Sequence, residues 1–429
     1  MLPILLGKCS VLMVDFTCRV KNKMSNIKNR VDKEDLCKRE DTLIFRYYEE
    51  GDELGIIELM KPYWRHLNSD KAREFWKWEY KSNPNGRSLI MLAEHEGKII
   101  GHYAMLPMKI RCGRTIVNGG KAEGSVVHPE YRGNIAPRFF KKEKDVRLFE
   151  ILIHNLFETA EKENVGLIFG FPNEVALKPQ IRAGYRYMPV PCTFMVLPID
   201  NDKAFHYLFS KKRFKAFFIF AFKLYYKVIT TAVGILCKNS KTDRFWERYR
   251  AENKVLIREI SESDLDEKID NFWGKYCIEN NCITIERSQK YIEWRFIQNP
   301  VIPHKVFVCE RNGEITAMVV INILLPDYPV ANIVDIIGLK KYEDDLHFLL
   351  SRTIQILKDN GVVIIKTWLS KNEQSKKYIR ILRKCKFCPL PIKCSLHLIV
   401  KILNSNLKED YINDINNWYI TMAFTEGVS

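Results

Sequence analysis

The segment from Gly120 to Gly184 constrains the fold of this chain more than any other. Its residues predict a short apolar strand at Ala122–Val127, followed by the loop His128-Pro-Glu-Tyr-Arg-Gly-Asn134. A helix and a second strand, Gly166–Pro172, come next, and Asn173 stands directly behind that strand. A glycine-containing loop that leads into a helix N-terminus presents backbone N–H groups to an anion. The pattern therefore predicts a site that holds a pyrophosphate.

The composition sets the class of protein. With 429 residues the chain is long enough for two domains, and 46% apolar with 28% charged residues is typical of a globular protein. The net charge of +16 indicates an anionic partner, ligand or surface. We do not expect nucleic acid, because no basic region carries interleaved stacking aromatics.

The twelve cysteines show no framework spacing, which favours free thiols in a reducing cytoplasm over disulfides. Cys385-x-x-Cys388 with Cys394 is half of a zinc motif. No second Cys/His pair stands at a matching spacing, so we expect no metal.

Charge and periodicity divide the chain into four parts. Residues 1–40 are expected to form a disordered tail, residues 41–200 a first domain, residues 201–250 a basic and aromatic linker, and residues 251–429 a second domain. In the first domain the pattern predicts two helices and several strands. The helices are Glu53–Met60 and Ala72–Tyr80, and the strands are Leu43–Tyr47, Ser88–Glu94, Lys98–Pro107, Met108–Val117 and Tyr185–Pro198.

The linker leaves three alternatives open. Phe205–Cys237 combines aromatic and aliphatic residues with many lysines, and Ala216–Leu236 has the length of a bilayer span. Lys223 and Lys227 would be costly at mid-membrane depth. The segment is therefore a helix packed between domains, a membrane-surface helix pair with snorkelling lysines, or a span.

The second half of the chain repeats the first. Trp78-x4-Asn83-Pro84 recurs as Trp294-x4-Asn299-Pro300, a shift of 216 residues that also carries Glu94 onto Glu310. Farther along, a shift of 202 residues carries Cys192 onto Cys394. A period this long indicates duplicated domains. In the second copy the loop is replaced by Lys340-Lys-Tyr-Glu-Asp-Asp-Leu346, which has no glycine and has acidic residues, so we expect no pyrophosphate there.

These residues carry a family resemblance. Val126-Val-His-Pro-Glu-Tyr-Arg-Gly133 resembles the signature loop of the GNAT acetyltransferase superfamily, and Phe169-Gly-Phe-Pro-Asn173 with Ala183-Gly-Tyr185 resembles the pattern downstream of it. From about Leu43 onward the chain is similar to two-domain, tandem GNAT proteins. The resemblance implies an α/β (α+β) fold in which each domain has a mixed, splayed central sheet flanked by helices. It also implies that acetyl-CoA binds between the strand before the loop and the strand that ends at Pro172.

The resemblance further implies roles for individual residues. Backbone N–H groups around Arg132, Gly133, Asn134 and Ala136 would meet the pyrophosphate. Val126 and Val127 would pair with the pantetheine arm like an added strand and polarise the thioester carbonyl. Asn173 would contact the cofactor beyond the second strand.

The sequence departs from the family pattern at three places. Ile135 and Pro137 stand at the two later glycine positions, unless a one-residue deletion places Ala136 at the last small position. A basic segment, Arg138–Arg147, is inserted before the next helix. Gln180 stands where the family often has its tyrosine general acid, so Tyr185 or Tyr187 would serve only through a different geometry.

Acyl transfer to an amine needs a proton acceptor and a proton donor. Glu123 is our choice for the general base, because burial among apolar neighbours would raise its pKa toward neutrality. Strand alternation could equally point it to solvent. His128 is a second candidate for the base, and Tyr185 is the candidate for the acid.

Two further groups have both a functional and a structural interpretation. Trp76, Trp78 and Tyr80 could line a site for a sugar-like acceptor, although three aromatics on one short helix more often belong to a core. Trp418–Glu426 is predicted to be a last strand, and Glu426 either enters the active site or belongs to a solvated end.

The leading hypothesis is a cytoplasmic, acetyl-CoA-dependent N-acetyltransferase of the GNAT type that acts by direct transfer in a ternary complex. The acceptor is expected to be a small-molecule primary amine, such as an amino sugar of a surface polysaccharide, with peripheral membrane contact through residues 205–237. Two alternatives remain open. One is a non-catalytic acyl-CoA-binding module, and the other is an aminoacyl transferase with a tRNA donor, which the positive charge allows.

Overall fold

The computed structural model describes residues 43–139, 145–209, 215–236, 243–324, 329–390 and 394–425. The predicted tail at 1–40, part of the basic insert and Glu426 lie outside these residues. The strands of the first half are β1 (Ile44–Tyr47), β2 (Leu89–His95), β3 (Lys98–Cys112), β4 (Thr115–Val127), β5 (Leu167–Gly170) and β6 (Arg186–Pro198). Those of the second half are β7 (Val255–Ile260), β8 (Ile283–Ile285), β9 (His304–Arg311), β10 (Glu314–Leu324), β11 (Val330–Gly338), β12 (Ile364–Ser370), β13 (Cys388–Pro389) and β14 (Cys394–Ile402).

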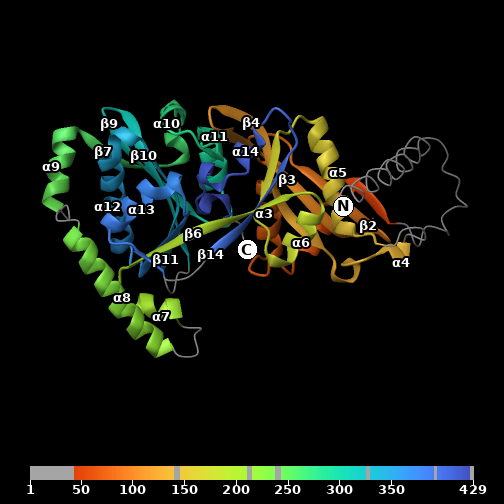
Figure 1. The fold of residues 1–429 in the computed structure, drawn as a ribbon, viewed down its shortest axis with the longest axis horizontal. Coiled ribbons are helices and arrows are strands. Elements are labelled where there is room, and N and C mark those ends of the chain that lie inside the picture. The colour runs from red at the N-terminus through yellow and green to blue at the C-terminus, as the bar shows by residue number, and fades with distance from the viewer. Residues whose placement is uncertain are drawn as a thin grey trace, which may run out of the picture.

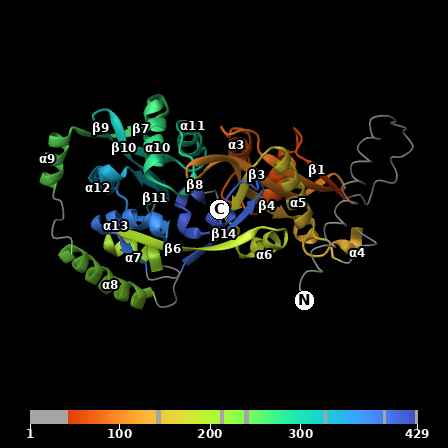
Figure 2. The same ribbon diagram turned by 45° about the horizontal axis from the view of Figure 1, so that its top comes forward.

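All of these strands belong to one open sheet of 14 strands. Its order is β1-β2-β3-β4-β5-β14-β6-β12-β11-β10-β9-β7, with β8 on β3 and β13 on β6. Most neighbours are antiparallel, whereas β4 and β5, and likewise β11 and β12, are parallel. Helices flank the sheet along its length (Figure 1, Figure 2). The expected α/β fold with a mixed sheet flanked by helices is confirmed.

The first half begins with an antiparallel meander. The hairpin between β2 and β3 turns at Glu96 (φ 51°) and Gly97 (φ 73°), two residues with positive φ, as a two-residue hairpin turn requires. The predicted boundary between strands at Pro107 is wrong, because β3 continues through Pro107 to Cys112 and β4 begins at Thr115. Pro107 is tolerated there because the pairing of β2 with β3 ends at Met105, so β2 does not pair with Pro107.

Five helices accompany these strands. They are α2 (Glu53–Met60), α3 (Ser69–Lys81), α4 (Ala136–Phe139), α5 (Leu148–Lys162) and α6 (Glu174–Arg182). Asn68 caps α3 by accepting the Lys71 N–H at 2.9 Å, and the helix stops one residue before Asn83-Pro84, as predicted. The predicted helix Glu53–Met60 is α2, and the predicted Ala72–Tyr80 lies inside α3.

The second half repeats this succession of elements. Its helices are α10 (Glu267–Glu279), α11 (Gln289–Ile292), which continues as the π-helical turn η4 (Glu293–Ile297), α12 (Glu343–Asp359) and α13 (Lys376–Lys384). The meander β9-β10-β11 corresponds to β2-β3-β4, and the parallel strand β12 corresponds to β5. In each half the parallel pair spans only three residue pairs and the two strands then diverge.

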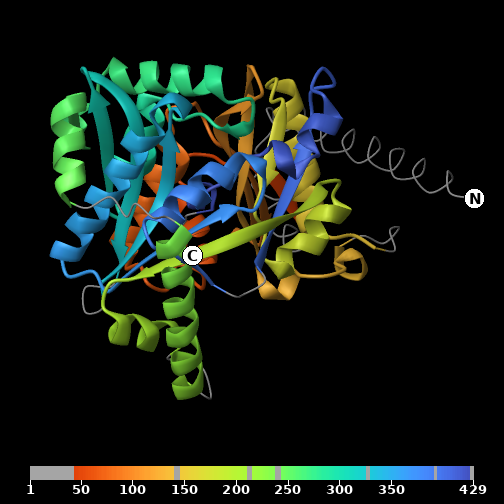
Figure 3. The same ribbon diagram turned by 60° about the vertical axis from the view of Figure 1, so that its left-hand side comes forward.

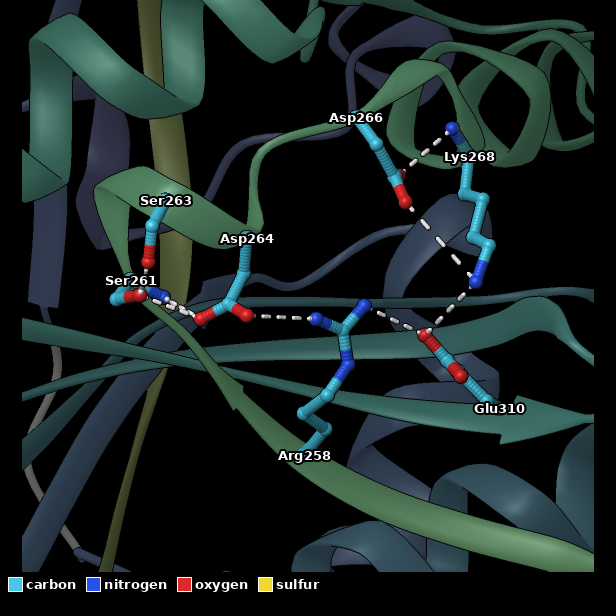
Figure 4. Close-up of polar contacts among 7 residues, drawn as sticks. All are labelled: Arg258, Ser261, Ser263, Asp264, Asp266, Lys268 and Glu310. Carbon is cyan, nitrogen blue, oxygen red and sulfur yellow. Dashed lines mark hydrogen bonds and ion pairs between the residues drawn. The ribbon is translucent and has the colours of Figure 1, made fainter.

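An ionic triad recurs in both halves. Figure 4 shows Arg258 between Asp264 (3.2 Å) and Glu310 (2.7 Å), beside the short turn η3 (Glu262–Asp264). In the first half Arg46 contacts Asp52 at 2.6 Å and Glu94 at 2.9 Å. The arginine and the aspartate are each shifted by 212 residues, 46 to 258 and 52 to 264, and the glutamate by 216, 94 to 310. The repeat therefore preserves a set of side-chain contacts as well as the order of elements.

The two halves exchange their last strands. β14 from the end of the chain lies between β5 and β6, and β6 in turn pairs with β12 of the second half. In the register of β6 and β14, Cys192 faces Cys394, the residue onto which the repeat carries it. The sheet therefore runs without interruption across the domain boundary that the sequence predicts at residue 200.

The C-terminal segment lies where β11 and β12 diverge. Tyr419 donates its hydroxyl proton to the carbonyl of Ile336 on β11, and Ser370 of β12 donates its N–H to Ile420 at 3.2 Å. Thr421 donates to Asp335, which also pairs with the fully buried Arg287 at 2.9 Å. The segment then forms the turn η8 (Met422–Phe424). The predicted strand at Trp418–Glu426 is wrong, because this segment makes only isolated bridges and fills the gap between two strands.

The linker forms helices outside the sheet. α7 (Asn201–Phe209) and α8 (Lys215–Leu236) make a helical hairpin, and α8 projects from the body of the molecule (Figure 3). α9 (Asp243–Asn253) follows in the chain. Outside the linker, one further short helix, α14 (Glu409–Ile412), comes after β14. Within the described ranges, no helix has the length and hydropathy needed to cross a membrane.

Candidate active site

The site is built where β4 leaves β5. The two strands pair from Gly119↔Leu167 to Lys121↔Phe169, after which β4 continues to Val127 without this neighbour. His128 donates its N–H to Ile100 of β3 at 2.8 Å, so by alternation the backbone groups of Val127 face the open edge. The Val127 carbonyl accepts a hydrogen bond there from Arg132 Nε at 2.9 Å. An extended ligand can add to such an edge as a further strand.

A bulge in β4 precedes the open edge. The register with β3 shifts between Glu123 and Val126, where Gly124 has φ +60°. A Cβ at Gly124 would lie 2.7 Å from both His102 and the Tyr80 hydroxyl, so only glycine fits. His102 accompanies the bulge, with Nδ1 2.6 Å from the Gly124 carbonyl, and its burial lowers the pKa of His102 to about 4.

A cavity of about 440 Å³, here called the loop cavity, lies between the glycine loop and α5. Gly133 and Arg132 line it together with Arg147 and Leu148 at the start of α5. No side chain caps this helix N-terminus, and the space beside Gly133 (φ +84°) is open, since a Cβ there would meet no atom within 4 Å. An uncapped helix end beside an accessible loop backbone suits a phosphate.

The loop residues predicted to contact the cofactor divide into two groups. Arg132, Gly133, Val127 and Asn173 line the loop cavity. Asn134 does not line it, because its Oδ1 accepts the Val146 N–H at 2.9 Å. Ala136 begins α4, and its side chain lies outside what the structure describes. The buried side chain of Ile135 explains why a large residue stands at a position where the family has glycine, because it packs in the core beneath the loop.

A second cavity of about 290 Å³, the carboxylate pocket, adjoins the loop cavity. Tyr63, Ser125, Asn173 and Ala176 line both cavities. The carboxylate pocket is named for two glutamates, Glu79 of α3 and Glu123 of β4, and it also contains Lys121, Tyr80, Gln180, Val126 and the aromatic rings of Trp64, Phe75 and Phe171.

The two glutamates have opposite pKa shifts. Burial, reinforced by the charge of Glu123, raises the pKa of Glu79 to about 8. Burial also opposes the ionisation of Glu123, but the charge and hydrogen bond of Lys121, 2.6 Å away, outweigh it and hold the pKa below its usual value. The prediction of a raised pKa for Glu123 is therefore wrong, because Lys121 precedes it by two residues and lies on the same face of the strand. Glu79 is the carboxylate that the apolar surroundings keep protonated near neutral pH.

Several predicted residues lie outside the carboxylate pocket. Tyr185 does not line it, because its hydroxyl bonds to that of Tyr103 at 2.7 Å in the core on the α5 side, where burial raises its pKa. His128 lines a different cavity, on the α2 side. Of Trp76, Trp78 and Tyr80, only Tyr80 lines the pocket, and Trp76 and Trp78 are core residues.

Gln180 occupies the place expected for the family's tyrosine. Its Nε2 lies 3.2 Å from the Ser125 hydroxyl, and its Oε1 is buried without a hydrogen-bond partner. A buried amide oxygen in the wall of the pocket is free to accept a hydrogen bond from a ligand.

Sequence reasoning missed Glu79, although a signal was present. It stands between Trp78 and Tyr80 on a helix whose neighbouring aromatics are buried, and a carboxylate at such a position is seldom buried without a role. Cys385 and Cys388 show no comparable arrangement. In the part of the chain that the structure describes, no three His, Cys, Asp or Glu side chains are grouped to hold a metal.

The site thus combines a splayed parallel strand pair, an open strand edge and an uncapped helix N-terminus beside a glycine loop. Residues 45–188 match the family model described as Acetyltransferase (GNAT) domain. Residues 45–188 are thus a GNAT acetyltransferase domain, and this domain supports an acyltransferase as the class of enzyme. No curated protein sequence matches the chain.

Three solved structures show the same fold. A GCN5-related N-acetyltransferase from Anabaena variabilis has a TM-score of 0.52 at 11% identity, with 85% of this chain and 73% of that chain covered. A probable N-acyltransferase from Enterococcus faecalis has a TM-score of 0.53 at 9% identity, with 84% and 72% covered. The N-myristoyltransferase of Saccharomyces cerevisiae with bound myristoyl-CoA has a TM-score of 0.50 at 14% identity, with 92% of both chains covered.

Proposed function

We propose that this protein transfers an acetyl group from acetyl-CoA directly to the primary amine of a small molecule, in a complex that holds both substrates. The observation that carries the proposal is that the loop cavity and the carboxylate pocket meet at Ser125 and Asn173. One cavity has the anion-binding backbone that a CoA pyrophosphate needs. The other has the titratable groups that amine chemistry needs.

The open edge of β4, the uncapped end of α5 and the space at Gly133 fit acyl-CoA. Bound there, the donor supplies the activated thioester. The backbone N–H of Val127 would align the pantetheine arm and polarise the carbonyl that the amine attacks, whereas the backbone groups of Val126 face His102 of β3.

The two glutamates suit opposite proton transfers. Glu123 is ionised at neutral pH and can accept the proton that the amine loses, directly or through water. Glu79 holds a proton below about pH 8 and can return one to the departing thiolate. Glu79 thereby takes the role of general acid that the sequence predicts for Tyr185, whose hydroxyl bonds to Tyr103 outside the pocket.

The size and lining of the carboxylate pocket support the choice of substrates. A volume of about 290 Å³ has to hold both the transferred acyl group and the acceptor amine, which favours acetyl over a long chain. Tyr63, Trp64 and Phe75 offer ring faces to an acceptor such as an amino sugar, and the carboxylates offer charge to its ammonium group.

The second half would not bind a donor of its own. Its helix α12 begins with Glu343, Asp344 and Asp345, and negative charge at a helix N-terminus opposes a pyrophosphate. The gap between β11 and β12 already holds residues 418–424. We assign it as a degenerate copy that shapes the complex.

The test is the melting temperature of the full chain with acetyl-CoA. We expect an upward shift that Gly133→Glu abolishes, because a carboxylate would stand where the pyrophosphate binds. Gly361→Glu is the matched control, since Gly361 also has positive φ and open space but lies in the second half. No shift at millimolar acetyl-CoA, or a shift that survives Gly133→Glu, would overturn the donor site.

The reaction is tested separately with a panel of amino sugars and other small amines, read out by mass spectrometry of the acylated product. Turnover with acetyl-CoA but not with myristoyl-CoA is expected. Donor binding without turnover of any amine would instead favour a non-catalytic binding module, which the position of Tyr185 also allows.

A further inference from the structure

We propose that the outer face of α8 docks the protein on an anionic phospholipid surface. The proposal does not depend on the acetyl transfer reaction. It rests on three features of α8: an exposed apolar stripe, lysines beside that stripe, and an inner face that is anchored to the body of the protein.

The apolar stripe consists of Phe220, Leu224 and Val228, which follow one another at four-residue intervals on one side of the helix. Their side chains are 69%, 56% and 57% exposed. A row of three large apolar side chains is unfavourable on a surface that faces water. A helix at a membrane interface buries such a row at the boundary between headgroups and acyl chains.

Lysines lie beside the stripe. Lys223 and Lys227 are exposed and stand one turn apart, each adjacent to a residue of the stripe, so their charged ends can reach a headgroup while their stems follow the apolar surface. Lys223 also contacts Asp202 of α7 at 2.5 Å. From Lys203 to Lys241 the sequence has nine Lys or Arg residues and no Asp or Glu, in a chain with 52 acidic residues overall. This charge is complementary to an anionic lipid surface and not to a neutral one.

The opposite face of α8 holds the helix in place. Phe222 is buried against Phe205 of α7, with ring centroids 5.4 Å apart, and Tyr225 donates its hydroxyl proton to the Pro389 carbonyl at 3.0 Å. The helix thus has a packed side and an outward side, and it projects from the body of the molecule (Figure 3). A projecting helix can meet a flat surface without a clash from the sheet behind it.

The experiment is co-sedimentation of the full chain with vesicles of phosphatidylcholine mixed with phosphatidylglycerol, and with vesicles of phosphatidylcholine alone. The stripe is removed by combining Phe220→Gln, Leu224→Gln and Val228→Gln, because glutamine keeps helix propensity. A triple variant at exposed apolar residues elsewhere, Leu54→Gln, Leu256→Gln and Ile278→Gln, is the matched control. A fourth protein carries Lys223→Gln and Lys227→Gln.

We expect the unmodified chain and the control to sediment with the anionic vesicles and not with the neutral ones. The partition coefficient should fall more than tenfold in the stripe variant and roughly tenfold in the lysine variant. Absence of binding to anionic vesicles, equal binding to neutral ones, or binding that survives loss of the stripe would overturn the proposal. So would a concentration-dependent dimer without lipid that the stripe variant abolishes, because the stripe would then be covered by a second copy of the chain.

Discussion

Trp78 and Trp294 hydrogen-bond to each other reciprocally. The indole N–H of Trp78 donates to the carbonyl of Trp294 at 2.7 Å, and the indole N–H of Trp294 donates to the carbonyl of Trp78 at 3.0 Å. The rings are stacked, with centroids 5.4 Å apart. The 216-residue repeat relates these two residues to each other, so the two halves of the chain contact each other here through corresponding side chains.

This pair predicts coupled stability effects. Trp78→Phe or Trp294→Phe keeps a ring but leaves a buried carbonyl without its donor, which should cost about 1–3 kcal/mol in the free energy of unfolding. Because the rings touch, the double variant should depart from the sum of the single effects. Urea unfolding of the four proteins measures this coupling. Strict additivity would contradict the reciprocal arrangement.

Glu79 predicts a dependence of stability on pH. Below its ordinary value of 4.5 the carboxyl is protonated in both the folded and the unfolded chain; between that value and about 8 only the unfolded chain ionises. The contribution of Glu79 to stability therefore falls as pH rises through this window, and Glu79→Gln removes the loss. The stability gained by Glu79→Gln should grow from near zero at acid pH to roughly 3–5 kcal/mol above pH 8. A gain that does not vary with pH, measured by urea unfolding, would contradict the raised pKa.

Replacing Glu123 should lower turnover without weakening the binding of acetyl-CoA. Glu123→Gln removes the proton acceptor but leaves the loop cavity unchanged, so the acetyl-CoA melting shift should persist while turnover falls about 10²–10⁴-fold. Glu130→Gln, at an exposed acidic residue of the loop that follows β4, is the control for loss of charge and should retain turnover. Unchanged turnover in Glu123→Gln would assign the base elsewhere.

The filled gap in the second half predicts the binding stoichiometry. Tyr419, Ile420 and Thr421 occupy the space between β11 and β12 with buried hydrogen bonds, so a ligand strand cannot add there. Isothermal titration with acetyl-CoA should give one site per chain. A stoichiometry of two acetyl-CoA molecules per chain would mean that residues 419–421 leave the gap between β11 and β12.

Local signals in the sequence predict much of the fold. The hairpin at Glu96-Gly97, the cap and stop of α3 and the strand–loop–helix unit around Gly133 all follow from turn, capping and periodicity rules. These features depend on neighbours in sequence, which is why a single sequence reveals them.

The parts that could not be predicted depend on distant contacts. The raised pKa of Glu79 on α3 comes from burial together with the charge of Glu123 on β4, and the lowered pKa of Glu123 depends on where Lys121 points. The misplacement of Tyr185 depends on its bond to Tyr103, 82 residues away. Nothing in the repeat indicates that its last strands are exchanged.

That exchange has a consequence for how the protein is made. β14 closes the free edge of β5, yet in chain order it follows every other strand that the structure describes. While the second half is being synthesised, β5 of the first half lacks its β14 partner beside the candidate active site. We expect an N-terminal fragment that ends near residue 200 to lack the β14 partner of β5 and to aggregate through that edge.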